Sequence, residues 1–200
     1  MVRSALARVP PWEVHLTGRL GPLDTDVDAL RARLSAQEQG ATHDLNDWIF
    51  SLVVPETGMR CLDLGCGFGK QSLPLAAMVG PDGGVTSVDI SAHALKQLRT
   101  VAQSLQIDRR IETVEAPLDD LPRTFKMAPF DIIHGAYSFY YVGAPEPFFQ
   151  RIISELKPKA KLFFCGPGRG NNAPLLALSR AAGAKTGRGP RPAANFMEEA

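Results

Sequence analysis

Residues 60–70, Arg-Cys-Leu-Asp-Leu-Gly-Cys-Gly-Phe-Gly-Lys, decide the fold of this 200-residue chain. The short apolar run Cys61–Leu64 holds one acid and is typical of a buried parallel strand. The three glycines that follow alternate with other residues and predict a tight turn, because glycine adopts backbone conformations that other residues avoid. Residues 71–78 predict a helix, whose free N-terminal N–H groups favour the anionic part of a ligand. A strand, a turn and a helix are therefore expected, with a ligand against the turn.

Two classes of cofactor are bound at turns of this kind. Dinucleotide sites use Gly-x-Gly-x-x-Gly. Here Gly65, Gly67 and Gly69 have the spacing Gly-x-Gly-x-Gly, and Lys70 occupies the position of the third dinucleotide glycine. Leu-Asp-Leu-Gly-Cys-Gly-Phe-Gly closely resembles the first motif of the class I, Rossmann-like S-adenosylmethionine-dependent methyltransferases, and the acid within the strand, Asp63, fits that class better. A nicotinamide oxidoreductase is the alternative, which Lys70 disfavours.

An acid at the end of the second predicted strand, residues 85–90, is the second anchor of the resemblance. Asp89 follows the glycines by about twenty residues, the interval at which an acid accepts hydrogen bonds from the ribose hydroxyls. A helix-capping acid is the alternative reading of Asp89, since a helix capped by Ser91 follows. The resemblance implies that S-adenosylmethionine lies across the C-terminal ends of the first two strands, bound by Asp63, Gly65, Cys66, Gly67, Asp89, Ile90, Leu118, Asp119 and Gly135.

The last three of these residues belong to two further motifs. Residues 117–122 follow a predicted third strand, 111–116, and resemble the acidic loop that holds adenine in the family. Pro117 departs from that pattern, so only the backbone of Leu118 and the side chain of Asp119 are carried over. Phe-Asp-Ile-Ile, in the predicted fourth strand 129–137, resembles the fourth motif.

The segment after the fourth strand supplies the candidate catalytic residue. Many small-molecule methyltransferases have a Leu-His-His-Val-like sequence here, whereas this chain has Phe139-Tyr140-Tyr141-Val142. Tyr140 becomes the candidate for orienting a substrate or lining its pocket, and packing under the next helix is the alternative. An unperturbed phenol is a poor base near neutral pH, but a base is dispensable when the nucleophile is already acidic and well aligned.

The expected architecture is an α/β, Rossmann-like three-layer sandwich with a mostly parallel sheet. Its parts are an N-terminal arm and lid helix (1–41), an S-adenosylmethionine-binding domain (42–182) and a flexible tail (183–200). A helix over 147–156, a Lys-Pro turn and a fifth strand over 161–165 end the recognisable pattern, so the sixth and seventh strands of the fold are absent from the sequence. The fifth strand would then expose an edge. Either the chain is a truncated form of a longer enzyme, or a homodimer or another partner chain covers that edge.

Net charge, apolar runs and cysteine spacing limit the kinds of partner that the chain is expected to bind. The net charge of +1 implies no nucleic-acid partner. Neither an apolar run of membrane-spanning length nor a signal-peptide pattern is present, which predicts a cytoplasmic protein without a membrane partner. The three cysteines have no metal-ligand spacing, so no metal is expected.

The resemblance implies methyl transfer from S-adenosylmethionine to an oxygen, nitrogen or carbon of a small molecule, as in the group of ubiquinone and menaquinone biosynthesis methyltransferases. No Asn-Pro-Pro-Tyr-like segment follows the fourth strand, which argues against amino-group methylation of nucleic acid. The alternative is a protein that binds the cofactor but is catalytically inactive or accessory.

Overall fold

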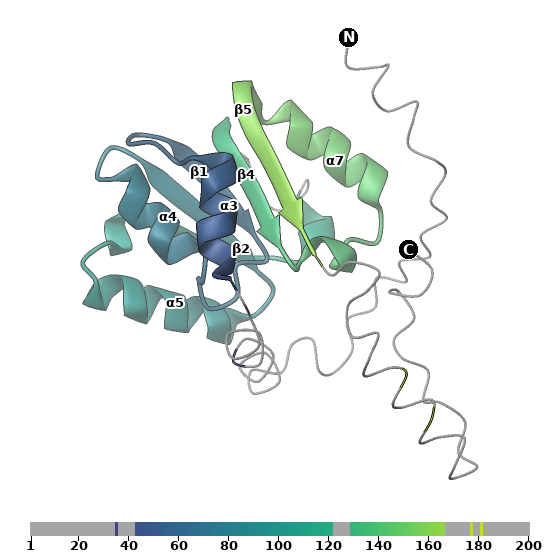
Figure 1. Ribbon diagram of the computed structural model, residues 1–200, viewed down its shortest axis with the longest axis horizontal. Coiled ribbons are helices and arrows are strands. Elements are labelled where there is room, and N and C mark those ends of the chain that lie inside the picture. Colours follow the sequence, from purple (N-terminus) through teal and green to yellow (C-terminus); the bar gives the residue numbers. More distant parts are fainter. Residues whose placement is uncertain (1–34, 36–42, 122–128, 167–176, 178–180, 182–200) are drawn as a thin grey trace. The chain divides into compact units, whose positions relative to one another are not determined.

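A parallel sheet of five strands forms the centre of the molecule (Figure 1). The computed structural model describes residues 35, 43–121, 129–166, 177 and 181. The strands lie in the order β3-β2-β1-β4-β5. Their bounds are β1 Arg60–Leu64, β2 Gly84–Asp89, β3 Ile111–Glu115, β4 Phe130–Ala136 and β5 Leu156–Cys165. The predicted α/β class and parallel sheet are therefore confirmed.

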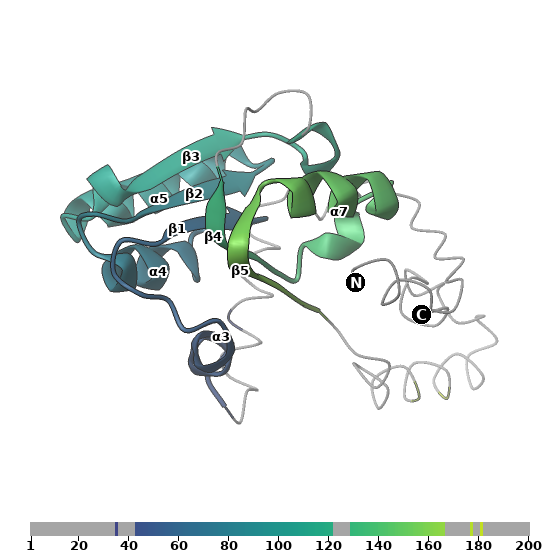
Figure 2. The same ribbon diagram turned by 90° about the horizontal axis from the view of Figure 1, so that it is seen from above.

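Helices cover both faces of this sheet, as Figure 2 shows from above. One face carries α3 (Leu45–Val53), α4 (Ser72–Val79) and α5 (Ala92–Ser104), and the other carries α7 (Pro145–Ser154). A separate apolar cluster lies under each layer, because β-strands buried on both faces need apolar side chains on both. The result is the expected three-layer sandwich.

Local signals set the helix ends. The Asp44 carboxylate accepts from the N–H groups of Asn46 and Asp47, at 2.7 and 3.1 Å, and so begins α3. The Ser91 hydroxyl begins α5 in the same way, accepting from the N–H of Ala94. Pro145 stands in the first turn of α7, which starts two residues before the predicted helix over 147–156.

The start of β5 differs from the prediction. The Lys-Pro segment before residue 161 was expected to be a turn, but β5 already begins at Leu156, paired with Phe130. The pairing then resumes at Ile132 opposite Lys161, so β5 advances by five residues while β4 advances by two. Lys159 takes up the extra length in the left-handed conformation, with φ 69°. This irregularity is a bulge in the strand pairing, which no local pattern announces.

All of these elements belong to one compact unit, Gly18–Gly166. A second unit, Met1–Thr17 with Pro167–Ala200, lies almost wholly outside the described residues. The predicted arm and lid helix (1–41) and the predicted tail (183–200) lie outside the described residues apart from Ser35, so those boundaries stay predictions. Within the described part β5 is an edge strand, paired only with β4. A partner chain over this edge also stays a prediction.

Candidate cofactor site

The glycine turn lies at the point where the strand order reverses. β1 pairs with β2 on one side and β4 on the other, and ligands of open parallel sheets bind outside the strand ends at such a point. All three glycines are left-handed, with φ of 74° at Gly65, 53° at Gly67 and 86° at Gly69. A Cβ on Gly65 would lie 2.2 Å from the Cβ of Ser138, which follows β4. The turn therefore needs glycine for conformation and for space.

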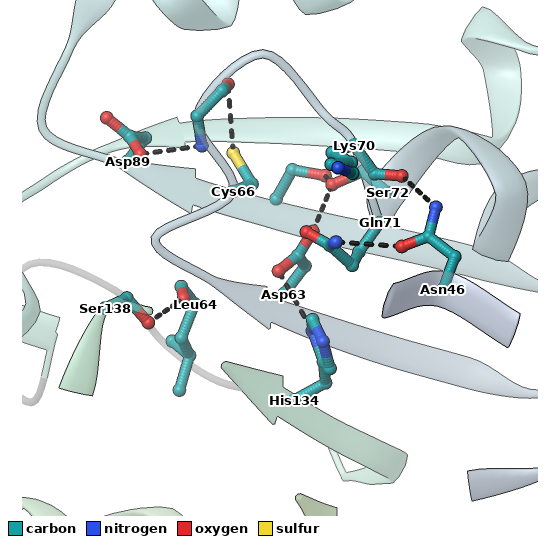
Figure 3. Close-up of polar contacts among 12 residues, drawn as sticks. Asn46, Asp63, Leu64, Cys66, Lys70, Gln71, Ser72, Asp89, His134 and Ser138 are labelled. Atoms are coloured by element: carbon teal, nitrogen blue, oxygen red, sulfur yellow. Dashed lines mark hydrogen bonds and ion pairs between the residues drawn. The ribbon is translucent and has the colours of Figure 1, made fainter. Parts of the chain in front are cut away.

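Ser138 also joins the turn to β4 by a hydrogen bond. Its buried hydroxyl donates to the carbonyl of Leu64 at 2.5 Å (Figure 3). Nothing in the sequence analysis pointed to this serine. It holds the end of β1 against the segment that follows β4, beside the glycine turn.

Asp89 holds the other side of the turn. The N–H groups of Gly65 and Cys66 donate to the carbonyl of Val88, and the N–H of Gly67 donates to a carboxylate oxygen of Asp89 at 2.8 Å. The second Asp89 oxygen accepts from the N–H of Ser91 at 2.8 Å. Both interpretations of Asp89 thus have a structural counterpart: it supports the start of α5 and lies against the glycine turn. Burial raises the pKa of its carboxyl, and these backbone hydrogen bonds oppose the rise.

An amide pair joins α3 to the other end of the turn. Asn46 donates from its side-chain nitrogen to the carbonyl of Lys70 at 3.0 Å, and Gln71 donates to the Asn46 side-chain oxygen at 2.8 Å (Figure 3). The sequence analysis did not single out either amide. Together they place the first turn of α3 beside Lys70 and Gln71, the two residues that precede α4.

The Asp63 side chain is buried within the sheet. Its side chain is 1% exposed, and its two oxygens face the hydroxyl of Ser72, at 2.5 Å, and Nδ1 of His134, at 3.1 Å (Figure 3). The hydroxyl of Ser87 donates in turn to Ser72 at 2.9 Å. The sequence analysis missed these three partners. A usable signal was present for His134, which follows the apolar pair Ile132-Ile133 within a predicted buried strand.

The Cys66 thiol is buried at the glycine turn, where it donates to the carbonyl of Gly67 at 3.7 Å. The side chain is buried against Leu95 and Leu98 of α5. Burial raises the pKa of this thiol well above its usual value, and the negative charges of Asp63 and Asp89 raise it further. The thiol is therefore protonated at neutral pH and does not compete as a nucleophile.

The predicted adenine loop is a short 3-10 turn, Leu118–Asp120. Both carboxylate oxygens of Asp119 accept from the N–H of Gly143, at 3.0 and 3.1 Å. Asp119 thereby joins this loop to the segment that leads into α7. Leu118 packs partly buried against the core, while Ile90 is at the surface.

Gly135 has a packing reason for its small size. A Cβ there would lie 2.7 Å from the ring of Phe164 on β5. The residue is buried within β4, one position before the strand ends. Two residues later Tyr137 is left-handed, with φ 56°, and its N–H donates to the carbonyl of Cys165. The chain thus turns sharply where β4 and β5 end.

Tyr140 lies in the turn beyond this bend, Phe139–Tyr141. Phe139 anchors that turn, with its ring 4.6 Å from Phe149 and 5.5 Å from Phe164 between centroids. The rings of Tyr140 and Tyr141 lie 4.5 Å apart, and a Cβ on Gly166, just past β5, would lie 4.0 Å from the ring of Tyr140. The Phe139 cluster thus holds two phenols near the ends of β4 and β5.

Solved structures of methyltransferases share this fold. A SAM-dependent methyltransferase from Aquifex aeolicus aligns with a TM-score of 0.59 at 20% identity, over 72% of this chain and 74% of that one. Coclaurine N-methyltransferase, solved with N-methylheliamine and SAH, aligns with a TM-score of 0.51 at 20% identity, over 60% of this chain and 34% of that one. The fold is that of the Rossmann-like S-adenosylmethionine-dependent methyltransferases. A family model described as "Methyltransferase domain" matches residues 55–185, and the chain belongs to this family.

Curated relatives are named for quinones. A 2-phytyl-1,4-naphtoquinone methyltransferase of Nostoc is 36% identical over 140 residues, which cover 64% of this chain and 60% of the relative. A ubiquinone biosynthesis O-methyltransferase of Xylella fastidiosa is 33% identical over 146 residues, which cover 70% of this chain and 56% of the relative. The chain thus spans less than two thirds of the length of either relative.

Two observations bear on metals and membranes. The described residues contain no group of three or more His, Cys, Asp or Glu side chains placed to hold a metal ion. Among the helices in the described part, none is long and apolar enough to cross a bilayer.

Proposed function

We propose that this protein binds S-adenosylmethionine across the glycine turn and transfers its methyl group to an oxygen, nitrogen or carbon of a small molecule. The observation that carries the proposal is the turn itself. Its three left-handed glycines lie at the strand-order reversal, and the N–H of Gly67 is held by Asp89. A bare backbone beside a carboxylate suits a nucleoside, whose ribose hydroxyls donate to the acid.

Each part of the site has a role in this proposal. Asp89 accepts from the ribose, the turn lets the cofactor approach the peptide closely, and the start of α4 favours the carboxylate of the methionyl group. The cofactor supplies a methyl group already activated on a sulfonium. The protein therefore needs mainly to align the acceptor and to exclude water.

The acceptor proposed is an aromatic ring of the quinol class. Tyr140 and Tyr141 present two phenols at the ends of β4 and β5, held by the cluster around Phe139. Aromatic side chains pack well on flat rings, and a phenol hydroxyl orients a polar substituent. The naphthoquinone and ubiquinone names of the curated relatives agree with such an acceptor. A phenolic hydroxyl or ring carbon of a quinol is acidic or electron-rich enough to react without a histidine base.

The test has two stages. Calorimetry first compares S-adenosylhomocysteine with NAD, and only the former should bind; NAD binding alone would refute the proposal. Transfer of a labelled methyl group is then measured with a demethylated naphthoquinol and a catechol, using Asp89→Ala as the binding-deficient control. Cofactor binding without transfer to either acceptor would favour the accessory function. The Asp119 carboxylate favours the accessory function, because both of its oxygens accept from the N–H of Gly143.

A further inference from the structure

The tyrosine turn, Phe139–Tyr141, carries the two phenols proposed to contact the acceptor. Its far end is held in two ways. Val142, the next residue, is fully buried in the core. The N–H of Gly143 donates to the carboxylate of Asp119, in the loop after β3, at 3.0 Å to one oxygen and 3.1 Å to the other. A displacement of the turn would therefore break contacts beyond it.

The near end of the tyrosine turn is held by the two residues that follow β4. The N–H of Tyr137 donates to the carbonyl of Cys165, the last residue of β5, at 2.8 Å. Tyr137 is left-handed, with φ 56°, a conformation that residues with a side chain rarely adopt. Such a conformation persists where the surrounding structure holds the chain in place. The chain therefore leaves β4 in a fixed direction, and Ser138 follows directly.

Ser138 is bonded both to the strand before the glycine turn and to the tyrosine turn. Its hydroxyl donates at 2.5 Å to the carbonyl of Leu64, the last residue of β1 (Figure 3). Its own carbonyl accepts from the N–H of Tyr141 at 3.0 Å. Its Cβ also faces Gly65, where an added Cβ would lie only 2.2 Å away. One residue, 4% exposed, thus connects the segment proposed to bind the cofactor with the segment proposed to bind the acceptor.

Methyl transfer depends on the alignment of its two reactants. An electron pair of the acceptor forms the new bond to the methyl carbon, while the carbon–sulfur bond breaks with its electrons remaining on sulfur and the acceptor releases its proton to water. A misplacement of about 1 Å can cost about 100-fold in rate. The glycine turn is proposed to place the methyl donor and the tyrosine turn the acceptor. A bond between these two segments therefore sets the alignment of the reactants.

We propose that Ser138 is a positioning residue, which aligns the acceptor with the methyl group by tying the tyrosine turn to the end of β1. The proposal rests on the proposed function, because it concerns the same methyl transfer. A serine hydroxyl has one proton, and the carbonyl of Leu64 accepts it, so Ser138 acts through the turn. Loss of the hydroxyl should therefore slow the transfer step while cofactor and acceptor still bind.

Two substitutions separate the hydrogen bond from packing. Ser138→Ala removes the hydroxyl but keeps the Cβ that faces Gly65, and Ser138→Gly removes both. A role in packing alone predicts that Ser138→Ala resembles the wild type and that only Ser138→Gly is impaired. The proposed role predicts that both variants are slow. The matched control is Ile132→Val, a buried residue of β4 that packs with α3 and α4 and whose truncation lowers stability away from the tyrosine turn.

The first readout needs no ligand. Hydrogen exchange followed by mass spectrometry measures peptides over 139–142, where the N–H groups of Tyr141 and Val142 bond to the carbonyls of Ser138 and Phe139. Exchange in β2 serves as the reference for opening of the whole domain. Relative to β2, both Ser138 variants should exchange these amides about tenfold faster than the wild type, the effect of one lost hydrogen bond. Ile132→Val should keep the wild-type ratio.

The second readout is the single-turnover rate of methyl transfer, at saturating S-adenosylmethionine, to the naphthoquinol or catechol that the wild type methylates. The rate is expressed per cofactor-binding site counted by calorimetry, which corrects for unfolded protein. Both Ser138 variants should be about tenfold slower, with the dissociation constant of S-adenosylhomocysteine and the acceptor KM within about twofold of the wild type. Ile132→Val should keep the wild-type rate.

A wild-type rate in Ser138→Ala would overturn the inference, as would a loss of cofactor affinity equal to the loss of rate. A slow rate with unchanged exchange would also overturn it, because the hydroxyl would then not hold the turn. If Ser138→Ala does not fold, Ser138→Cys, whose thiol is a weaker donor, is read in the same way. Absence of transfer by the wild type would instead refute the proposed function and with it the alignment role, while the exchange readout would still show whether Ser138 holds the turn.

Discussion

Replacing Gly65 by alanine tests the geometry on which the site depends. Gly65 is left-handed, with φ 74°, which costs a residue with a Cβ about 1–2 kcal/mol. The new methyl group would also lie 2.2 Å from the Cβ of Ser138 and 3.0 Å from its hydroxyl oxygen. Overpacking of this kind costs about 1–3 kcal/mol. Gly65→Ala should therefore lower the free energy of unfolding by roughly 2–5 kcal/mol, a large share of the typical 5–15 kcal/mol.

Gly58 provides the matched control. It is also left-handed, with φ 83°, but a Cβ there would meet nothing within 4 Å. Gly58→Ala should thus cost only the backbone term, about 1–2 kcal/mol. The difference between the two alanine variants isolates the contact with Ser138. In a Ser138→Gly background, Gly65→Ala should cost no more than Gly58→Ala, because the opposing side chain is gone.

Urea unfolding followed by circular dichroism measures the wild type, the three single variants and the double variant, with linear extrapolation to water. Calorimetry with S-adenosylhomocysteine follows on the variants that fold, and only those with alanine at position 65 should bind more weakly. Equal destabilisation by Gly65→Ala and Gly58→Ala would refute the reasoning. The glycine turn would then not abut the end of β4.

Two further predictions concern Asp89 and Tyr140. Burial raises the pKa of Asp89 above its ordinary 3.8, and ribose binding needs the carboxylate. The affinity for S-adenosylhomocysteine should therefore fall as the pH drops through the raised pKa of Asp89. Asp89→Asn should bind more weakly by about 1–3 kcal/mol, and calorimetry across acid pH should show a flatter dependence of its affinity on pH. Identical pH profiles for the wild type and the variant would remove Asp89 from the site. Tyr140→Phe should leave the affinity for S-adenosylhomocysteine unchanged and lower kcat/KM for methyl transfer by about three- to tenfold, the effect of one hydroxyl hydrogen bond. An equal loss of cofactor affinity would contradict a role of Tyr140 on the acceptor side.

The order of elements was predictable because it depends on local patterns. The apolar runs that became β1 and β2 and the helix start at Ser91 lie where the sequence placed them, within a residue or two. The start of β5 was not predictable. Residues 157–161, Lys-Pro-Lys-Ala-Lys, contain a proline and three cations, which argue against a buried strand. Their place in β5 depends on contacts from elsewhere in the chain: Lys157 pairs with Asp131, and Lys161 donates to the carbonyl of Val53.

Some residues of the candidate site could likewise be predicted from local patterns, and others could not. The glycine turn and the acid at the end of β2 could be identified from spacing alone, since a strand, a turn and the next strand bring them together whatever the rest of the chain does. The surroundings of Asp63 could not. Its partner His134 is 71 positions away, and the two meet only because the strand order places β4 beside β1.

The sequence by itself determined that a strand, a glycine turn and a helix follow one another, and it predicted a nucleoside-type site there with an acid from the next strand. Those features follow from backbone sterics and apolar periodicity, which act over a few residues. Only the tertiary structure decided that the Asp63 side chain is buried and that Ser138 bonds to the carbonyl of Leu64 at the end of β1. Side-chain partners across a parallel sheet depend on strand order and register, and these are fixed by the packing of the whole domain.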